Sequence, residues 1–317
     1  MRFRLSALSA LLLALCFSIG AAAQDSLPLF ADEAILEVSI EGPLDTLMRE
    51  RSDEEYYDGV LRYADGAEVH SLDLRFRTRG NFRRRKETCR FPPVRLNFKK
   101  QQVEGTLFEG QNILKLVTHC RPNSGRYEEY VVRELLAYRI FNRVTPVSFR
   151  ARQLRITWVN TEDGNDEDVR YGFLIEHKNE LEDRLQLEEP GYNSIQYDAL
   201  NPQQAALAAV FQYMIGNTDF SMVTAVEGEA CCHNGILLQK SRGDIYFVPY
   251  DFDMAGIVDA PYAAPNPRFR LRSVTSRLYR GDCLFNDYLD EAIGRFAAIK
   301  NDVEELIATQ EGLERRA

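Results

Sequence analysis

Three segments in the second half of the chain carry residues that suit phosphoryl transfer. They are Ile215-Gly-Asn-Thr-Asp-Phe-Ser221, His233-Asn-Gly-Ile-Leu-Leu238 and Val248-Pro-Tyr-Asp-Phe-Asp253. Phosphoryl transfer needs metal ions that bridge the nucleotide phosphates and a carboxylate that accepts the proton of the substrate hydroxyl. An Asp in a loop, an Asn downstream and a further Asp at the end of a hairpin supply such groups. The three segments therefore predict a kinase-like enzyme.

A helix and a hairpin are expected to position these residues. Asn201-Pro202 predicts a helix start, with an N-cap followed by Pro at the first helical position. Apolar residues then follow helical spacing, so this helix leads directly into Gly216-Asn-Thr-Asp219. Residues 235–239 and 245–250 predict two short strands joined by the turn at 240–244, because Gly there allows a left-handed residue. The hairpin ends on Asp251.

The first half of the chain is expected to be mainly β. Residues 72–78 and 94–98 alternate between apolar and polar types, which indicates half-buried strands. Residues 113–117 predict another strand, and an apolar stripe predicts a helix over 127–143. Two further strands are expected over 153–159 and 171–177, joined by an acidic hairpin loop over 161–168.

This order of elements is the order of the protein-kinase fold. The predicted fold class is α+β, in a two-lobed protein-kinase-like architecture. Residues 1–23 are read as a signal peptide, 24–177 as a β-rich N-terminal lobe with one helix, and 178–317 as a mainly helical C-terminal lobe. A long amphipathic helix is expected from residue 287 to about residue 313.

Four short motifs occur in a fixed order along the chain. They are Arg79-Gly-Asn81 with the basic stretch after it, Ile113-Leu-Lys-Leu116, Tyr171-Gly-Phe-Leu-Ile-Glu176 and Tyr250-Asp-Phe-Asp253. In this order they resemble the spore-coat CotH kinase-like family, whose members are similar to atypical protein kinases. The match spans roughly residues 70–260. The resemblance implies ATP or another nucleotide with Mg²⁺ or Mn²⁺, and a protein or small-molecule acceptor.

The same resemblance implies roles for individual residues. It makes Asp219 the base, while Asn217 holds the loop or the acceptor. It makes Asp251 a metal ligand, assisted by Asn234 and by Asp253. The alternative for each is a purely local role, because Asp and Asn side chains often bond to nearby backbone groups in loops and turns.

Lys115 and Glu134 form a second expected pair. Each carries a charge in a mainly apolar segment, and leaving a buried charge unpaired costs about 3–5 kcal/mol. An ion pair between them would match the one by which kinases hold the nucleotide phosphates. The alternative is that Lys115 faces solvent on the outer side of the sheet, which a period of two permits.

The chain departs from the kinase pattern in three places, one of which is Asp253, where kinases have Gly. It has no G-x-G-x-x-G loop, so Arg79 and Arg83 in the basic stretch would have to bind the phosphates. The alternative is that this stretch is a solvated turn. Asp219 and Asn234 are 15 positions apart, whereas kinases separate the equivalent residues by five.

Two other functions stay open beside the kinase hypothesis. One is a catalytically inactive binding module that uses the same cleft. The other is a metal-dependent phosphoester hydrolase that places Asp219, His233, Asp251 and Asp253 around a metal ion. Turnover of phosphoesters without a nucleotide distinguishes the hydrolase from the other two.

The first residues predict export. Met1-Arg-Phe-Arg4 is basic, residues 5–19 are largely apolar, and Ala21-Ala-Ala23 suits signal-peptide cleavage. No later run approaches the roughly 20 apolar residues of a membrane helix. The product is expected in the periplasm or secreted. Cleavage removes two arginines and no acidic residue, so the formal net charge changes from −9 to −11, which argues against general nucleic-acid binding.

Five cysteines remain after cleavage, and export favours disulfides. Cys89 and Cys120 flank two expected strands, and closing this loop would stabilise the chain by roughly 3.7 kcal/mol. Either Cys231 or Cys232 is then expected to pair with Cys283. The alternative is a zinc site that combines these three cysteines with His233, although adjacent cysteines lack the spacer of common zinc motifs.

Overall fold

The computed structural model describes residues 27–122, 124–163, 167–226, 228, 230–241 and 243–314. The expected signal peptide, residues 1–23, lies outside these ranges. Within the ranges, the structure has no helix that is both long enough and apolar enough to cross a membrane.

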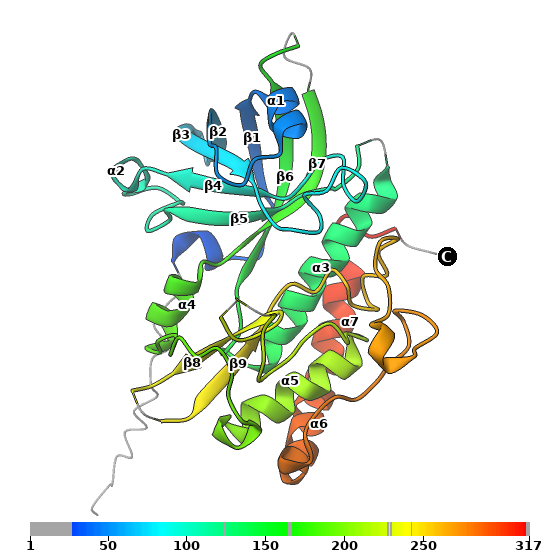
Figure 1. Cartoon of the computed structure of the whole chain (residues 1–317). Helices are drawn as coiled ribbons and strands as arrows, with labels where there is room; N and C mark the ends of the chain where they lie inside the picture. The colour runs from blue at the N-terminus through cyan, green and yellow to red at the C-terminus, as the bar shows by residue number, and fades with distance from the viewer. Residues whose placement is uncertain are drawn as a thin grey trace, which may run out of the picture.

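Seven strands close into a barrel in the order β1-β2-β3-β4-β5-β7-β6 (Figure 1). Their bounds are β1 (Leu36–Gly42), β2 (Tyr57–Asp65), β3 (Glu68–Thr78), β4 (Val94–Phe98), β5 (Ile113–Val117), β6 (Ala151–Asn160) and β7 (Glu167–Ile175). Strands β1 and β6 pair in parallel, and all other neighbours are antiparallel. The parallel pair closes the barrel. Short helices α1 (Leu44–Glu50) and α2 (Lys100–Val103) lie in its connections.

Apolar and polar residues alternate along the strands, and the apolar side chains fill the barrel. Leu72, Leu74 and Phe76 of β3 are buried in its core, whereas Asp73 and Arg75 between them are exposed. The same pattern holds in β4 and β5. The strands predicted over 72–78, 94–98 and 113–117 are thus confirmed.

A second hydrophobic cluster lies against the outside of β5, β6 and β7. It contains the long helix α3 (Gly125–Val144), helix α5 (Pro202–Met214) and the hairpin of β8 (Gly235–Gln239) and β9 (Ile245–Pro249). Helix α4 (Lys178–Leu185) connects the barrel to this part. In Figure 1, α3 runs from the barrel toward α5, and the yellow hairpin lies below the barrel. The predicted helix before Asp219 and the predicted hairpin after it are both confirmed.

The two-lobed protein-kinase-like architecture predicted from the sequence is wrong. The strands form a closed seven-stranded mixed barrel, and the strands after α3 return to complete it. Alternation identifies a strand and its buried face, but it does not specify a distant partner. The pairing of β1 with β6 therefore has no local signal. The division into residues 24–177 and 178–317 stays a prediction.

The single helix predicted from residue 287 to about residue 313 is also wrong. Helix α6 (Leu289–Ala298) follows a 3-10 turn, and α7 (Lys300–Thr309) starts after an interruption at Ile299. Beyond α7, Gln310 accepts a hydrogen bond from Arg139 at 2.8 Å and donates one to Gln153 at 2.7 Å. These bonds attach the end of the chain to α3 and β6.

Cys89 and Cys120 form the predicted disulfide, with an Sγ–Sγ distance of 2.06 Å. Cys231 and Cys232 lie at bonding distance from each other, so the predicted pairing of one of them with Cys283 is wrong. Cys283 is an exposed free thiol. Bonding between Cys231 and Cys232 also removes the thiolates that a zinc site would need. Both bonds are compatible with an oxidising compartment.

Replacing both Cys89 and Cys120 by Ser is expected to lower the free energy of unfolding by about 3–4 kcal/mol. The unfolded chain regains the entropy of a loop whose ends are 31 positions apart. Urea unfolding of wild type and double variant measures the difference, and Cys283→Ser serves as the control. An unchanged unfolding midpoint in the double variant contradicts this expectation.

Candidate functional site

A cleft of about 790 Å³ lies between the barrel and the hairpin. One wall comes from β4, β5 and the segment after β3, and the other from the hairpin and the loop before it. Seven of the nine residues predicted from the sequence line it: Arg79, Arg83, Lys115, Asp219, Asn234, Asp251 and Asp253. The structure thus brings together segments that are far apart in the sequence.

The other two predicted residues, Asn217 and Glu134, are each 1% exposed and do not line the cleft. The Asn217 side-chain oxygen accepts a hydrogen bond from the backbone N–H of Asp219 at 2.8 Å. Glu134 lies on α3 and accepts a hydrogen bond from the guanidinium of Arg83. Both residues therefore act by holding others in place.

The open end of the hairpin brings Asn234 and Asp251 together. Strand β8 starts directly after Asn234, and β9 ends shortly before Asp251. The backbone N–H of Tyr250 donates to the carbonyl of Asn234 at 3.1 Å. Both Asn234 and Asp251 adopt a left-handed backbone, with φ of 51° and 61°, which Asn and Asp tolerate better than most residues. The Asp251 N–H also donates to the Tyr138 hydroxyl at 2.9 Å, which fixes this end of the hairpin to α3.

The carboxylate of Asp219 is held at both oxygens. His233 Nε2 is hydrogen-bonded to Oδ1 at 2.9 Å, and Asn234 Nδ2 donates to Oδ2 at 3.0 Å. Asn234 also donates to the backbone carbonyl of Asp219 at 2.6 Å. About a third of the Asp219 side chain remains exposed to the cleft. The arrangement therefore fixes a reachable carboxylate in one orientation.

Glu134 pairs with Arg83 and not with Lys115, so the predicted ion pair is wrong. Arg83 Nη1 lies 2.9 Å from Glu134 Oε2, and Nη2 lies 3.4 Å from Oε1. A guanidinium can meet a carboxylate with two parallel hydrogen bonds, whereas an ammonium is a point charge. The segment after β3 places this guanidinium beside α3.

Lys115 lies instead over the ring of Tyr250, with Nζ 4.8 Å from the ring centroid. It points outward from the barrel, as a period of two permits, but the hairpin covers it. Burial lowers the pKa of Lys115 to about 8, and the nearby charge of Arg79 adds to this effect. Charging this lysine is therefore less favourable in the folded chain than in the unfolded chain.

Arg79, Arg95 and Lys115 form a basic wall of the cleft. None of them has an ion-pair partner within the residues that the structure describes. Arg95 and Lys115 lie directly opposite each other on β4 and β5, where like charges are destabilising. Burial and the charge of Arg83 lower the pKa of Arg79. Arg95 was missed from the sequence, although the alternation over 94–98 placed it on the polar face of the expected strand.

Arg83 contacts both aspartates to which the sequence assigns a metal ion, and the third such residue, Asn234, donates its side-chain N–H groups to Asp219. Arg83 Nη2 lies 3.2 Å from Asp251 Oδ1, and its Nε lies 3.2 Å from Asp253 Oδ2. A divalent cation at these oxygens would meet the like charge of the guanidinium. In the described part of the chain, no group of three or more His, Cys, Asp or Glu side chains is placed to hold a metal. In this arrangement Asp251 and Asp253 do not fit as ligands of one ion.

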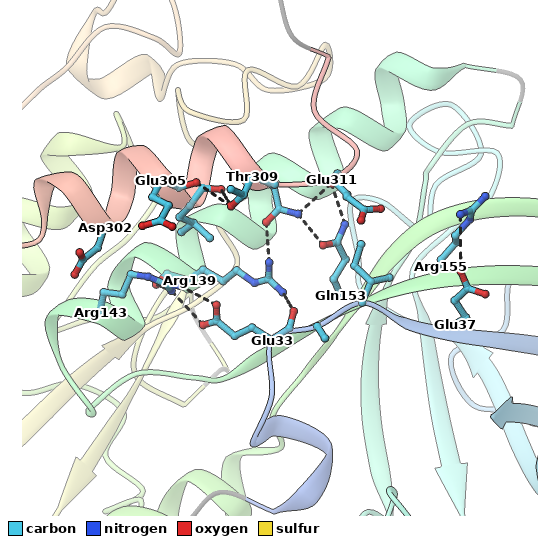
Figure 2. A pocket seen from close by; sticks show the side chains of 14 residues that line it. Glu33, Glu37, Arg139, Arg143, Gln153, Arg155, Asp302, Glu305, Thr309 and Glu311 are labelled. Atoms are coloured by element: carbon cyan, nitrogen blue, oxygen red, sulfur yellow. Dashed lines mark hydrogen bonds and ion pairs between the residues drawn. The ribbon is translucent and has the colours of Figure 1, made fainter. Parts of the chain in front are cut away.

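A second cavity, of about 740 Å³, lies on another face, where α3 and α7 meet the segment before β1 (Figure 2). Its basic residues already have partners. Arg143 forms an ion pair with Glu33 at 2.8 Å, and Arg139 donates to Gln310 and to the carbonyl of Glu33. This network joins the two ends of the described chain and is structural.

No protein-family model matches the sequence, and no curated protein matches it either. The resemblance to the CotH kinase-like family therefore rests on the short motifs alone. The function is inferred below from the geometry and charge of the cleft.

Asp253→Asn is expected to reduce the pH dependence of stability between about pH 4 and pH 7. Burial raises the pKa of Asp253 to about 7 against the opposing charge of Arg83. The folded state then keeps a proton that the unfolded chain releases, so stability falls as the pH rises through this window. Burial also raises the pKa of Glu180 to about 7, so the variant retains part of the slope.

Urea unfolding from pH 4 to pH 8 measures this difference. The exposed Asp65→Asn is the matched control, and its pH profile should follow wild type. A profile of Asp253→Asn that is parallel to wild type over the whole range contradicts the assignment.

Proposed function

We propose that this protein is an exported phosphotransferase that binds the phosphates of a nucleotide in the cleft and transfers a phosphoryl group to an acceptor hydroxyl. The observation that carries the proposal is the basic wall beside an oriented carboxylate. Arg79, Arg95 and Lys115 provide positive charge without ion-pair partners in the described chain, and Asp219 lines the same cleft.

The basic wall suits a polyphosphate because the folded chain holds mutually repelling charges there. Arg95 and Lys115 face each other across neighbouring strands, and burial together with the charge of Arg79 lowers the pKa of Lys115. A bound polyanion relieves this repulsion and favours the charged lysine. Perturbed titratable groups in a cleft are typical of functional sites. Arginine also binds phosphate oxygens with two hydrogen bonds.

Asp219 suits the role of general base. The acceptor oxygen attacks the terminal phosphorus, and its proton passes to an oxygen of Asp219. The bond between that phosphorus and the bridging oxygen breaks, and the nucleoside diphosphate leaves with the bond electrons. His233 and Asn234 hold the carboxylate in one orientation throughout this step. The acceptor is a protein or small-molecule hydroxyl.

Export is the second part of the proposal. The basic and apolar residues of 1–23 predict a signal peptide, and two cysteine pairs lie at bonding distance. Disulfides persist outside the reducing cytoplasm. The nucleotide would then have to be available in the periplasm or outside the cell.

A phosphoester hydrolase is the second candidate, and one contact favours it. The hydrogen bond between His233 and Asp219 is the arrangement by which a carboxylate orients a histidine base toward water. Release of phosphate from a simple phosphomonoester, without any nucleotide, supports the hydrolase. Tight ATP binding without turnover of any kind supports a catalytically inactive binding module.

Lys115→Met is expected to raise stability at pH 7 and to weaken ATP binding by about tenfold or more, about 1.4 kcal/mol. Lysine with a lowered pKa destabilises the folded state below about pH 8, so the gain in stability shrinks as the pH rises above that value. Binding of ATP at pH 8 should also take up protons in wild type and fewer in the variant.

Calorimetry in buffers of different ionisation enthalpy measures the affinity and the proton uptake together. Lys300→Met, at an exposed position on α7, is the control and should match wild type. Equal ATP affinity in wild type and Lys115→Met would remove Lys115 from the binding site.

Asp219→Asn is expected to spare ATP binding and to lower turnover by about 10²–10⁴-fold, the usual effect of losing a general base. The amide keeps the shape of the side chain and an oxygen that accepts a hydrogen bond, but it does not take up the acceptor proton. Release of ADP from ATP, with or without labelling of the chain itself, measures turnover. Asp65→Asn is the control, and undiminished ADP release by Asp219→Asn contradicts the role of base.

A further inference from the structure

The guanidinium of Arg83 lies among three carboxylates that come from two different parts of the fold. Glu134 belongs to α3, and Asp251 and Asp253 follow β9. Arg83 Nη1 lies 2.9 Å from Glu134, Nη2 lies 3.2 Å from Asp251, and Nε lies 3.2 Å from Asp253. Each of the three guanidinium nitrogens thus has a carboxylate oxygen within ion-pair distance.

Burial separates the inner and outer parts of this cluster. The side chains of Arg83, Glu134 and Asp253 are 9%, 2% and 8% exposed, whereas that of Asp251 is 42% exposed. Arg83 and Asp251 both line the cleft. The edge of the guanidinium that carries Nη2 is therefore the part nearest to a bound anion.

We propose that Arg83 is the resident cation of this cleft and that it takes the place, between Asp251 and Asp253, to which the sequence assigns a divalent metal ion. The cleft then binds the phosphates of a nucleotide without a metal ion held by the protein. The inference rests on the proposed function, because it presumes that a nucleotide occupies the cleft.

Two features of the cluster support this role. Arginine keeps its charge at all physiological pH values, so it is a permanent cation. Displacing it with a metal ion would leave Glu134 buried without its partner, and breaking a buried ion pair in this way is strongly unfavourable. Arg79 and Lys115 add further positive charge from the same cleft, so the phosphate charge is met without a divalent ion.

The first test compares ATP binding to the wild-type protein by calorimetry in excess EDTA, in excess Mg²⁺ and in excess Mn²⁺. We expect the Kd in EDTA to lie within about tenfold of the Kd in Mg²⁺. Binding that requires Mg²⁺ or Mn²⁺ overturns the inference and leaves the proposed function standing. Absence of ATP binding under all three conditions overturns both.

Two variants test whether Arg83 accounts for ATP binding without a metal ion. Asp251→Ala should bind ATP in EDTA as tightly as wild type or more tightly, because it removes a negative charge and releases Nη2 toward the phosphates. A metal-ligand role predicts the opposite, namely loss of binding. Arg83→Met should lose about tenfold or more of its ATP affinity in EDTA.

Folding of the Arg83 variant is checked by circular dichroism, since the substitution leaves Glu134 without its partner. If Arg83→Met does not fold, Asp251→Ala decides between the two models alone, because its side chain is the most exposed of the three carboxylates. Asp65→Ala, in β2, is the matched control for loss of one carboxylate. Loss of ATP affinity in Asp251→Ala, with Asp65→Ala unchanged, overturns the inference.

Discussion

The contact of Arg83 with Glu134, Asp251 and Asp253 is the interaction on which the cleft depends. Arg83 belongs to the segment between β3 and β4, Glu134 to α3, and the two aspartates to the end of the hairpin. One guanidinium thus joins the barrel to the long helix and to the hairpin. Because Glu134 and Asp253 are largely buried, the folded chain needs a cation at this point to offset their desolvation. Arg83 therefore joins the two walls of the cleft, together with the contact of Lys115 with Tyr250.

The hairpin carries this constraint to Asp219. Asp251 lies at the end of one hairpin strand, and Asn234 lies beside it at the start of the other. Asn234 in turn donates two hydrogen bonds to Asp219, one to its side chain and one to its backbone. Asp251 and Asn234 thus link the Arg83 contact to the carboxylate that is proposed as the base. In the proposed reaction, the end of the hairpin would therefore link the phosphate-binding guanidinium to the carboxylate that orients the acceptor.

Local patterns in the sequence were sufficient to predict most elements and insufficient to predict how they pair. Alternation identified β4 with its observed bounds, the strand predicted over 113–117 has the bounds of β5, and an N-cap with Pro identified the start of α5. The parallel pairing of β1 with β6 was missed because closure depends on distant segments. The same limit applies to the functional site, where positions were predicted better than pairings. Residue types and hairpin ends located Asp219 and Asp251, but the partner of Glu134 was assigned to Lys115. Arg83 lies in a segment without periodicity, so nothing local showed which cation would reach α3.

The charge of the cleft follows from the packing of the barrel. Each strand of the barrel turns its apolar residues inward, so Arg95 and Lys115 must point outward from neighbouring strands. Over most of a barrel such residues are solvated, and their repulsion is screened. Here the hairpin places the ring of Tyr250 over Lys115 and removes much of the water, which is why the pKa of Lys115 falls to about 8. The fold thus places positively charged side chains where water solvates them poorly. An anionic occupant of the cleft would relieve that cost. This is the physical reason why we propose phosphate binding in this cleft and not in the cavity beside α7, where Arg143 is paired with Glu33 and Arg139 is hydrogen-bonded to Gln310.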